Sequence, residues 1–334
     1  MIKFIAETAW HHEGDFYFMQ DLVERLCNET EVNIIKMHIT LDFDEYMSDD
    51  HDLYGRLKKW LLTEKQWDLL VNLVHNSDKE LMLLLNDDAA IDFAARHAPE
   101  YVELHSACLN VPKLQSSILD KIDKNTKIVI GVGGCSLQEV DAAVRVFEGR
   151  STVIMTGFQN FPTQYEDINL NKIRRIRSLY PNKEFGYADH TAWNELNNEL
   201  ITLMVAANGM NYIEKHITTV YGEERCDYAA TISFKMMNEL VRKIKILDLV
   251  NGNGALELNK GERQYSVYGP MKMAAIATDD IKAGTVIENK HFNFIRTSEI
   301  TDISQIGMVD NVGDKIYSDI GTGEIFKSSH FIRN

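Results

Sequence analysis

Short β-rich runs alternate with helical patterns through most of the chain, and this alternation limits the fold more than any other feature. The sequence predicts eight strands, at residues 3–8, 33–39, 81–85, 101–106, 127–132, 152–158, 185–189 and 212–218. Helical periodicity lies between and after them, for example at residues 17–27, 64–75, 137–147, 195–207 and 234–249. Eight strand–helix units are what a (β/α)8 barrel requires. An open doubly wound sheet shows the same alternation, but its glycine-rich nucleotide-binding turn is missing after the first strand. We therefore predict an α/β protein built on a TIM barrel.

The pattern changes after Asn251, where glycines punctuate a connecting stretch and short apolar runs separated by turns follow. We predict a barrel domain over residues 1–255, a linker over 256–270 and a small, mostly β domain over 271–334. A domain of that size buries too little apolar surface for a large core of its own, so we expect it to pack on another surface.

The composition excludes several classes of protein. A formal net charge of −15 argues against nonspecific nucleic-acid binding, which needs clustered Lys and Arg. No apolar run approaches the roughly 20 residues that span a bilayer, and the first residues are typical of a strand rather than a signal peptide. These features predict a cytoplasmic protein. The four cysteines form no CxxC pair, so we expect free thiols and neither a zinc knuckle nor a disulfide framework.

Two predicted strands each end at a histidine, in Gly186-Tyr187-Ala188-Asp189-His190-Thr191 and Ile213-Glu214-Lys215-His216-Ile217-Thr218. Because residues i and i+2 of a strand share a face, Glu214 and His216 point one way and Lys215 the other. The same parity places His190 on a face with two small residues, which leaves room for a ligand. Two imidazoles on neighbouring strand ends predict a divalent-metal site. Satisfied core or surface histidines are the alternative.

Other polar residues also lie at the predicted carboxyl ends of the strands, where a barrel of this kind places its reacting groups. They are Glu7, His11, His12, Lys36, His38, Asn86, Asp87, Glu103, His105, Ser106 and Gln159, in addition to His190, Glu214 and His216. Each also has a structural interpretation. Lys36 could simply pair with Glu7, and His105 could cap a backbone carbonyl.

With these motifs in order, the chain resembles the sialic acid synthase family, whose members join phosphoenolpyruvate to an N-acetylated amino sugar in a metal-dependent barrel. The resemblance extends over essentially the whole chain, and its motifs are Phe4-Ile5-Ala6-Glu7, His12-Glu13-Gly14, Ile34-Ile35-Lys36, Pro162-Thr163-Gln164-Tyr165-Glu166-Asp167, the segment from Gly186 to Thr191, and Glu214-Lys215-His216. The tail, with Asp280-Ile281-Lys282-Ala283-Gly284 and Phe294-Ile295-Arg296, is similar to the antifreeze-like (SAF) domain of that family.

The resemblance implies a role for several residues. It makes His190 and His216 the ligands of a divalent metal, Mn²⁺ or Mg²⁺ with Zn²⁺ as the alternative. Glu7 and Glu214 would be carboxylates that handle the sugar or position water, and Lys36 would be an anion-binding cation. Asp227 would bind the sugar, and Arg296 would reach the active site of the partner subunit. The family arrangement thus implies a domain-swapped homodimer.

The chain departs from that family on the phosphate-binding side. The family's lysine on the fourth strand is replaced by Glu103, although Ser106 is kept. Other positions that supply donors in the family are occupied by Asn86, Gly131, Ala188, Gln159, Phe161, His11 and His38. A carboxylate facing a phosphate in a dry site costs several kcal/mol, on the order of a buried unpaired charge.

Three interpretations remain open. A rearranged pocket, with His38, His105 and His11 as new donors, still accepts phosphoenolpyruvate. Alternatively, the barrel has moved to aldolase, isomerase or hydrolase chemistry on the same metal, with Glu103 and His105 as additional ligands. In the third interpretation, the chain is a non-catalytic sugar-binding subunit.

Overall fold

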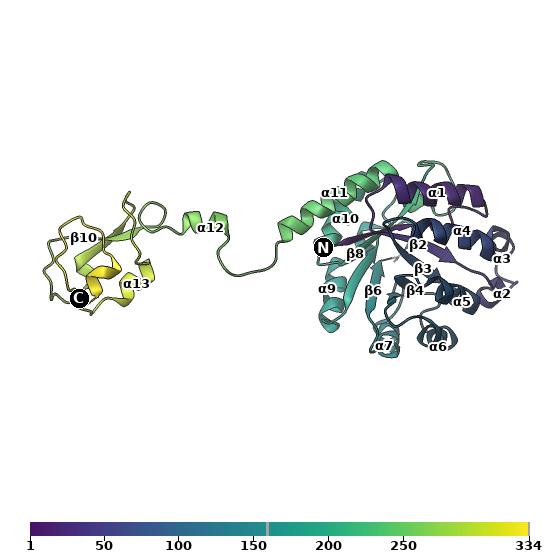
Figure 1. Cartoon of the computed structure of the whole chain (residues 1–334), viewed down its shortest axis with the longest axis horizontal. Coiled ribbons are helices and arrows are strands. Elements are labelled where there is room, and N and C mark those ends of the chain that lie inside the picture. Colours follow the sequence, from purple (N-terminus) through teal and green to yellow (C-terminus); the bar gives the residue numbers. More distant parts are fainter. Residues whose placement is uncertain (158–159, 333–334) are drawn as a thin grey trace. The chain divides into compact units, whose positions relative to one another are not determined.

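A computed structural model describes residues 1–157 and 160–332. The chain divides into two compact units, Met1–Gly252 and Asn253–Asn334 (Figure 1). The domain boundaries predicted from the sequence, at 255 and 271, stay a proposal. Within the described ranges, no helix combines the length and the apolar character needed to cross a membrane.

The first unit is a closed barrel of parallel strands, and this confirms the predicted TIM-barrel fold. Its strands are β1 (Lys3–Glu7), β2 (Ile34–Ile39), β3 (Glu80–Leu85), β4 (Tyr101–Leu104), β5 (Lys127–Gly131), β6 (Thr152–Gly157), β7 (Glu184–Ala188) and β8 (Tyr212–Thr218). They pair in sequence order, and β1 also pairs with β8 to close the ring. A short ninth strand, β9 (Thr231–Ser233), continues beside β8.

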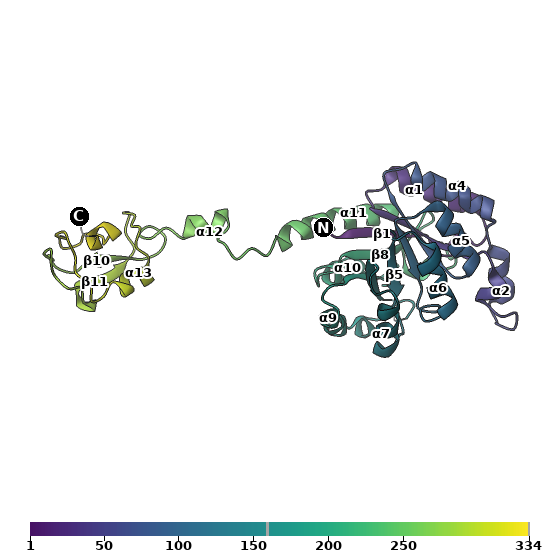
Figure 2. The same ribbon diagram turned by 60° about the horizontal axis from the view of Figure 1, so that its bottom comes forward.

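Helices surround the strands in both views of the barrel (Figures 1 and 2). They are α1 (Phe16–Glu29), α2 (Phe43–Tyr46), α3 (Tyr54–Leu57), α4 (Glu64–His75), α5 (Asp88–His97), α6 (Pro112–Lys121), α7 (Leu137–Val146), α8 (Tyr165–Ile168), α9 (Leu170–Leu179), α10 (Asn198–Ala206) and α11 (Phe234–Asn251). Local sequence signals set several of their starts. Ser136 and Glu139, for example, form a reciprocal capping box at the start of α7.

Four strands, β1, β4, β5 and β7, end one or two residues earlier than the sequence predicts. β4 ends at Leu104 because His105 already begins a turn, in which its carbonyl oxygen accepts the N–H of Cys108 at 2.9 Å. The described part of β6 reaches Gly157, whose φ of +95° lies in the left-handed region, and residue 158 lies outside the described residues. The early end of β4 brings His105 to the rim of the barrel.

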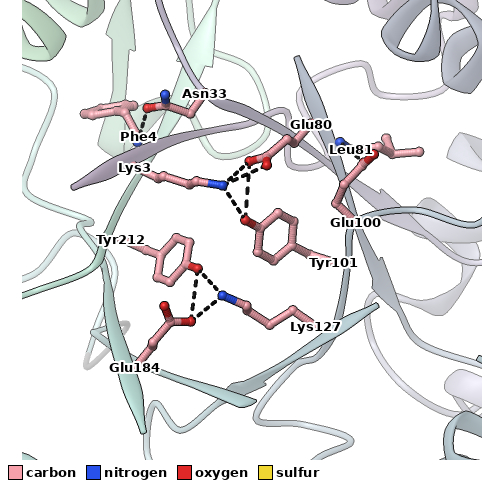
Figure 3. A network of polar contacts seen from close by, with 10 residues as sticks. All are labelled: Lys3, Phe4, Asn33, Glu80, Leu81, Glu100, Tyr101, Lys127, Glu184 and Tyr212. Atoms are coloured by element: carbon pink, nitrogen blue, oxygen red, sulfur yellow. Dashed lines mark hydrogen bonds and ion pairs between the residues drawn. The ribbon is translucent and has the colours of Figure 1, made fainter. Parts of the chain in front are cut away.

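The amino end of the barrel is closed by two polar triads (Figure 3). In the first, Lys3 Nζ lies 2.6 Å from Glu80 Oε2 and 2.9 Å from the hydroxyl of Tyr101. These three residues begin β1, β3 and β4, respectively. Lys3 and Glu80 are partly exposed, and Tyr101 is buried, so the triad separates solvent from the apolar barrel interior.

The second triad has the same chemistry on the opposite strands. Lys127 pairs with Glu184 and lies 2.8 Å from the hydroxyl of Tyr212, and these residues begin β5, β7 and β8. The rings of Tyr101 and Tyr212 meet edge to face, with centroids 5.9 Å apart, above the floor that the two lysines and two glutamates form. The lysine, glutamate and tyrosine of the second triad therefore each lie four strands after the same residue type in the first triad.

The second unit contains few regular elements. They are α12 (Lys260–Tyr265), the antiparallel strands β10 (Ala274–Ala277) and β11 (Phe292–Ile295), and α13 (Gln305–Asp310). Isolated bridges such as Ile281↔Ile320 extend the β character of this unit. It has a small apolar cluster of its own around Ile287, Met308 and Phe326. Part of the predicted linker is therefore helical, because α12 lies within residues 256–270.

Candidate active site at the barrel mouth

A cavity of about 190 Å³ lies at the carboxyl ends of the strands, and every barrel strand contributes to its wall. Its polar lining residues are Lys36, His38, Glu103, His105, Ser106, Thr156, His190, Glu214, His216, Asp227, Glu7 and Trp10. Because parallel strands all end at one edge of a barrel, residues far apart in the sequence meet here. Most of the predicted site residues therefore share one small space.

His190 and His216 converge in this cavity, as the parity of their strands predicts. Their ring centroids are 4.7 Å apart, and the rings are nearly perpendicular, at 83°. His190 Nδ1 lies 3.0 Å from the carbonyl oxygen of Ala188, so Nδ1 carries the proton and Nε2 has the lone pair. Burial lowers the pKa of His190 to about 4, and it lowers the pKa of His216 well below its usual range. Both imidazoles are therefore neutral, which is the form that binds metals.

This histidine pair fits a divalent cation. His216 Nδ1 is buried and has no hydrogen-bond partner among the described residues. Within the same residues, no group of three or more His, Cys, Asp and Glu side chains has the geometry of a complete metal site. A bound cation would therefore take its other ligands from water and substrate oxygens, as catalytic sites with open positions do. The ring of Phe161 packs against both imidazoles, at centroid distances of 5.8 Å and 6.2 Å.

Lys36 lies at the centre of three buried carboxylates. Its Nζ is 2.8 Å from Glu7 Oε2, 2.8 Å from Glu103 Oε2 and 3.0 Å from Glu214 Oε2. All four side chains are 3% exposed. The ion pair between Lys36 and Glu7 that the sequence suggested is present, but it is one of three. One ammonium thus faces three carboxyl groups, an excess of two negative charges when all are ionised.

The excess of buried carboxylates shifts their titration. Burial, together with the neighbouring carboxylates Glu103 and Glu7, raises the pKa of Glu214 to about 8 despite the opposing effect of Lys36. The pKa of Glu7 is raised as well, chiefly by burial. Burial disfavours the charged form of Lys36, but the three carboxylates outweigh it, so its pKa lies well above the usual value. At neutral pH Glu214 therefore holds a proton, and Lys36 stays charged.

Hydrogen bonds are unevenly shared within this cluster. Both oxygens of Glu214 accept from Lys36 Nζ at 3.0 Å. Glu7 Oε1 accepts the backbone N–H of Ala9 at 2.9 Å. Glu7 Oε2 and Glu103 Oε2 are buried and receive no hydrogen bond of good geometry from the described residues, although both contact the ammonium.

The remaining predicted site residues have different positions. His38, His105, Ser106 and Asp227 line the cavity. The amide of Asn86 donates to His38 Nε2 at 2.6 Å, but Asn86 itself lines a neighbouring groove. His105 Nδ1 accepts the N–H of Ala107 at 3.4 Å, and the carbonyl cap that the sequence suggests for His105 stays a prediction.

Two further predicted residues have described contacts of their own. His11 is buried beside the cavity, where its Nδ1 donates to the carbonyl oxygen of Cys226 at 2.5 Å. Arg296 belongs to the second unit and donates to the carbonyl oxygen of Pro270. Gln159 lies outside the described residues.

Sequence reasoning missed two features of the site. Trp10 lines the cavity, and its ring centroid is 5.3 Å from that of His38. Behind the histidines, Lys215 Nζ and Asp189 Oδ2 form an ion pair at 2.9 Å with no exposure of either side chain. The alternation of Asp189 with His190 and of Lys215 with His216 was the signal that could have predicted this pair.

The closed barrel, with titratable groups converging at the carboxyl ends of its strands, defines a TIM-barrel protein with a candidate active site at the usual end of the barrel. The chain belongs to the NeuB family, whose model matches residues 29–255. It is 24% identical to N,N'-diacetyllegionaminic acid synthase of Legionella pneumophila, with 98% of this chain and 93% of the relative covered. It is also 24% identical to human N-acetylneuraminate-9-phosphate synthase, with 94% of each chain covered.

The solved structures support the same fold. An N-acetylneuraminic acid synthetase from Leptospira borgpetersenii superposes with a TM-score of 0.71 at 21% identity, and 79% of this chain and 89% of that one are covered. At this level of identity the likeness shows the fold alone.

Proposed function

We propose that the barrel mouth forms a carbon–carbon bond at the aldehyde carbon of an amino sugar or a related aldehyde sugar in carbohydrate biosynthesis. The observation that carries this proposal is the convergence of two neutral imidazoles, His190 and His216, on one small cavity with the carboxyl groups of Glu7 and Glu214. Membership of the NeuB family supports the reaction class. The chain would be a transferase if phosphoenolpyruvate is the carbon donor, as the family resemblance implies.

His190 and His216 would hold the cation, which when bound supplies Lewis-acid polarisation of the sugar carbonyl. Imidazole ligands favour Mn²⁺ or Zn²⁺ over Mg²⁺, which prefers oxygen ligands. Glu214, whose raised pKa favours the protonated form, lines the same cavity. It would donate its proton to the carbonyl oxygen of the sugar as that oxygen gains negative charge. Asp227, whose Oδ2 accepts the N–H of Trp10 at 3.1 Å, lies at the same cavity and would orient a sugar hydroxyl.

The metal assignment predicts that metal content falls when His190 and His216 are replaced but not when a histidine outside the cavity is replaced. We expect the protein to bind about one Mn²⁺ or Zn²⁺ per chain and the double variant His190→Ala/His216→Ala to lose that site, because both proposed ligands are gone. Equilibrium dialysis with elemental analysis, and the electron paramagnetic resonance signal of free Mn²⁺, measure the loss directly. His75→Ala is the matched control, since that histidine lies outside the cavity. Equal metal content in the double variant and the wild type would refute the assignment.

A second candidate function keeps the sugar and the metal but does not use phosphoenolpyruvate. It is favoured by the contact between Glu103 and Lys36, which places a carboxylate on the cation that would receive a phosphate. On this alternative the chain is a metal-dependent aldolase, isomerase or hydrolase. A non-catalytic sugar-binding subunit is a third candidate, but such a protein has no need of the costly buried cluster around Lys36.

Several further features remain proposals about the assembled protein. We propose that residues 271–334 form an antifreeze-like domain, that the protein is a domain-swapped homodimer and that Arg296 serves the partner's active site. Cytoplasmic location also stays a prediction. The excess of acidic residues supports the expectation that nucleic acid is not a partner.

A further inference from the structure

The cavity wall carries an excess of negative charge that no described lining residue balances. Four carboxyl groups line it, from Glu7, Glu103, Glu214 and Asp227, and Lys36 is the single Lys or Arg among the described lining residues. When all four are ionised, four carboxylates face one ammonium. Phosphoenolpyruvate combines a phosphate with a carboxylate, and anions of this kind call for several cations and N–H or O–H donors.

The wall also offers hydrogen-bond acceptors rather than donors, which favours a ligand that can donate hydrogen bonds. Glu7 Oε2 and Glu103 Oε2 both contact Lys36 Nζ at 2.8 Å, but neither receives a hydrogen bond of good geometry from the described residues, and both residues are only 2% exposed. Buried acceptors of this kind are costly unless a ligand or water donates to them. The fully ionised form of an enol phosphate has no N–H or O–H group to offer. A hydroxyl group, in contrast, donates one hydrogen bond to a carboxylate and can also accept one from Lys36.

The carboxyl group of Glu103 packs closely against the backbone of the neighbouring strand β5. A Cβ added to Gly131 on the neighbouring strand would lie 3.1 Å from Glu103 Oε1 and 3.2 Å from the backbone nitrogen of Ser106. The absence of a side chain at Gly131 therefore makes the space in which the Glu103 carboxyl group sits. Lys36 lies on one side of this carboxylate and β5 on the other, so an anion that approaches the Lys36 ammonium would also meet the Glu103 carboxylate.

The size of the cavity also limits the ligand. The cavity measures about 190 Å³. A short polyhydroxyl compound fits this space.

We propose that the wall formed by Glu7, Lys36 and Glu103 binds a neutral, phosphate-free hydroxycarbonyl compound through its hydroxyl groups. This inference rests on the proposed sugar function, and it names the class of the ligand that occupies the site assigned to phosphoenolpyruvate by resemblance. Hydroxyl groups donate well-aligned hydrogen bonds to the two carboxylate oxygens that now have only the ion-pair contact with Lys36, and the ligand brings no charge that Lys36 would have to neutralise.

The test compares two neutral probes, dihydroxyacetone and D-erythrose, with phosphoenolpyruvate and inorganic phosphate. Binding to the full-length protein is measured by NMR titration, with and without Mg²⁺, at pH 7. We expect a neutral probe to bind at millimolar concentration, as is usual for such small ligands, and both anions to bind at least tenfold more weakly. If either anion binds as tightly as the neutral probes, or if neither neutral probe binds, the inference is overturned.

Two variants of Glu103 place the ligand on this wall. Glu103→Gln keeps the shape but replaces one acceptor by a donor, and we expect at least a fivefold loss of affinity for the neutral probe. Glu103→Lys should create measurable binding of phosphoenolpyruvate. Glu148→Gln, an exposed carboxylate between α7 and β6, is the matched control and should change neither affinity. Unchanged neutral-probe binding in Glu103→Gln would place the ligand elsewhere.

This experiment separates failure of the inference from failure of the proposed function. Tight binding of phosphoenolpyruvate by the wild type overturns the inference and leaves carbon–carbon bond formation standing. Metal binding that is independent of His190 and His216 overturns the proposed function, whatever the neutral probes do. Thermal unfolding of each variant, measured on the same samples, shows that the compared proteins are folded.

Discussion

Replacement of Lys36 by Met should lower the free energy of unfolding by about 3–5 kcal/mol at pH 7, the usual cost of removing one partner from a buried ion pair. Met has nearly the same length, so the loss is electrostatic rather than a cavity. Glu7, Glu103 and Glu214 would then share a buried space without the ammonium that now contacts all three. Urea-induced unfolding followed by circular dichroism measures the difference.

The loss of unfolding free energy in Lys36→Met should increase as the pH rises. The folded-state pKa values of Glu7 and Glu214 are already raised, and removal of the lysine raises them further. A carboxyl group whose folded pKa is raised costs no stability below its unfolded value of about 4.3 and costs progressively more as the pH rises above it. The variant should therefore approach the wild type near pH 4–5 and fall further behind it up to pH 9.

Two comparisons make this prediction specific. Adding Glu103→Gln to Lys36→Met should recover part of the loss, because it removes one of the unpaired charges. Lys235→Met, at an exposed position of α11, is the matched control and should change stability by less than about 0.5 kcal/mol. A loss that is the same from pH 5 to pH 9 would contradict the electrostatic explanation.

The second large loss of stability is expected at the buried ion pair between Lys215 and Asp189. Lys215→Met should also cost about 3–5 kcal/mol, because Lys215 and Asp189 are a fully buried pair and Asp189 would lose its counter-ion. The two threonines that hydrogen-bond to Asp189, Thr191 and Thr202, cannot replace the charge. Thermal and urea-induced unfolding give the size of the loss.

The stability deficit of this second variant should also shrink in acid. Burial alone would raise the pKa of Asp189, but Lys215 and the threonine hydroxyls outweigh it and lower the pKa. Its contribution to stability is therefore present above the unfolded value of about 3.9 and is lost as the pH falls through the folded-state pKa. Without Lys215 the folded-state pKa of Asp189 rises, so the variant loses less stability than the wild type as the pH falls, and the difference between the two proteins narrows.

The double variant Asp189→Asn/Lys215→Met separates charge from packing. It removes both charges at once, and it should be more stable than Lys215→Met alone. The pair also joins the ends of β7 and β8, from which His190 and His216 project, so Mn²⁺ or Zn²⁺ affinity should fall in the single variant and partly recover in the double variant. A single variant as stable as the wild type would show that the buried pair contributes nothing.

The sequence predicted correctly those features that depend on the geometry of a single strand or on the order of strands and helices. Period-two parity correctly predicted that Glu214 and His216 share a face and that Lys215 points away from them. The alternation of strands and helices predicted the barrel, and the barrel rule collected most of the residues that line the mouth. Both predictions depend on local geometry that adjacent residues encode.

What the sequence could not predict depends on several strands at once. The contact between Glu103 and Lys36 requires the tilt and closure of the whole barrel, because the two residues lie on β4 and β2 with β3 between them. For the same reason, Glu103 looked like a lost phosphate ligand in the sequence, whereas in the structure it is also a partner of the central lysine. The early turn at His105 was likewise hidden, since it depends on a backbone contact with Cys108.

The two triads at the barrel floor divide between the two halves of the barrel. Lys3, Glu80 and Tyr101 all belong to the first four strands, and Lys127, Glu184 and Tyr212 all belong to the last four. A break in the backbone between β4 and β5 would therefore divide neither triad, and the edge-to-face contact of Tyr101 with Tyr212 would still link the two pieces at the floor.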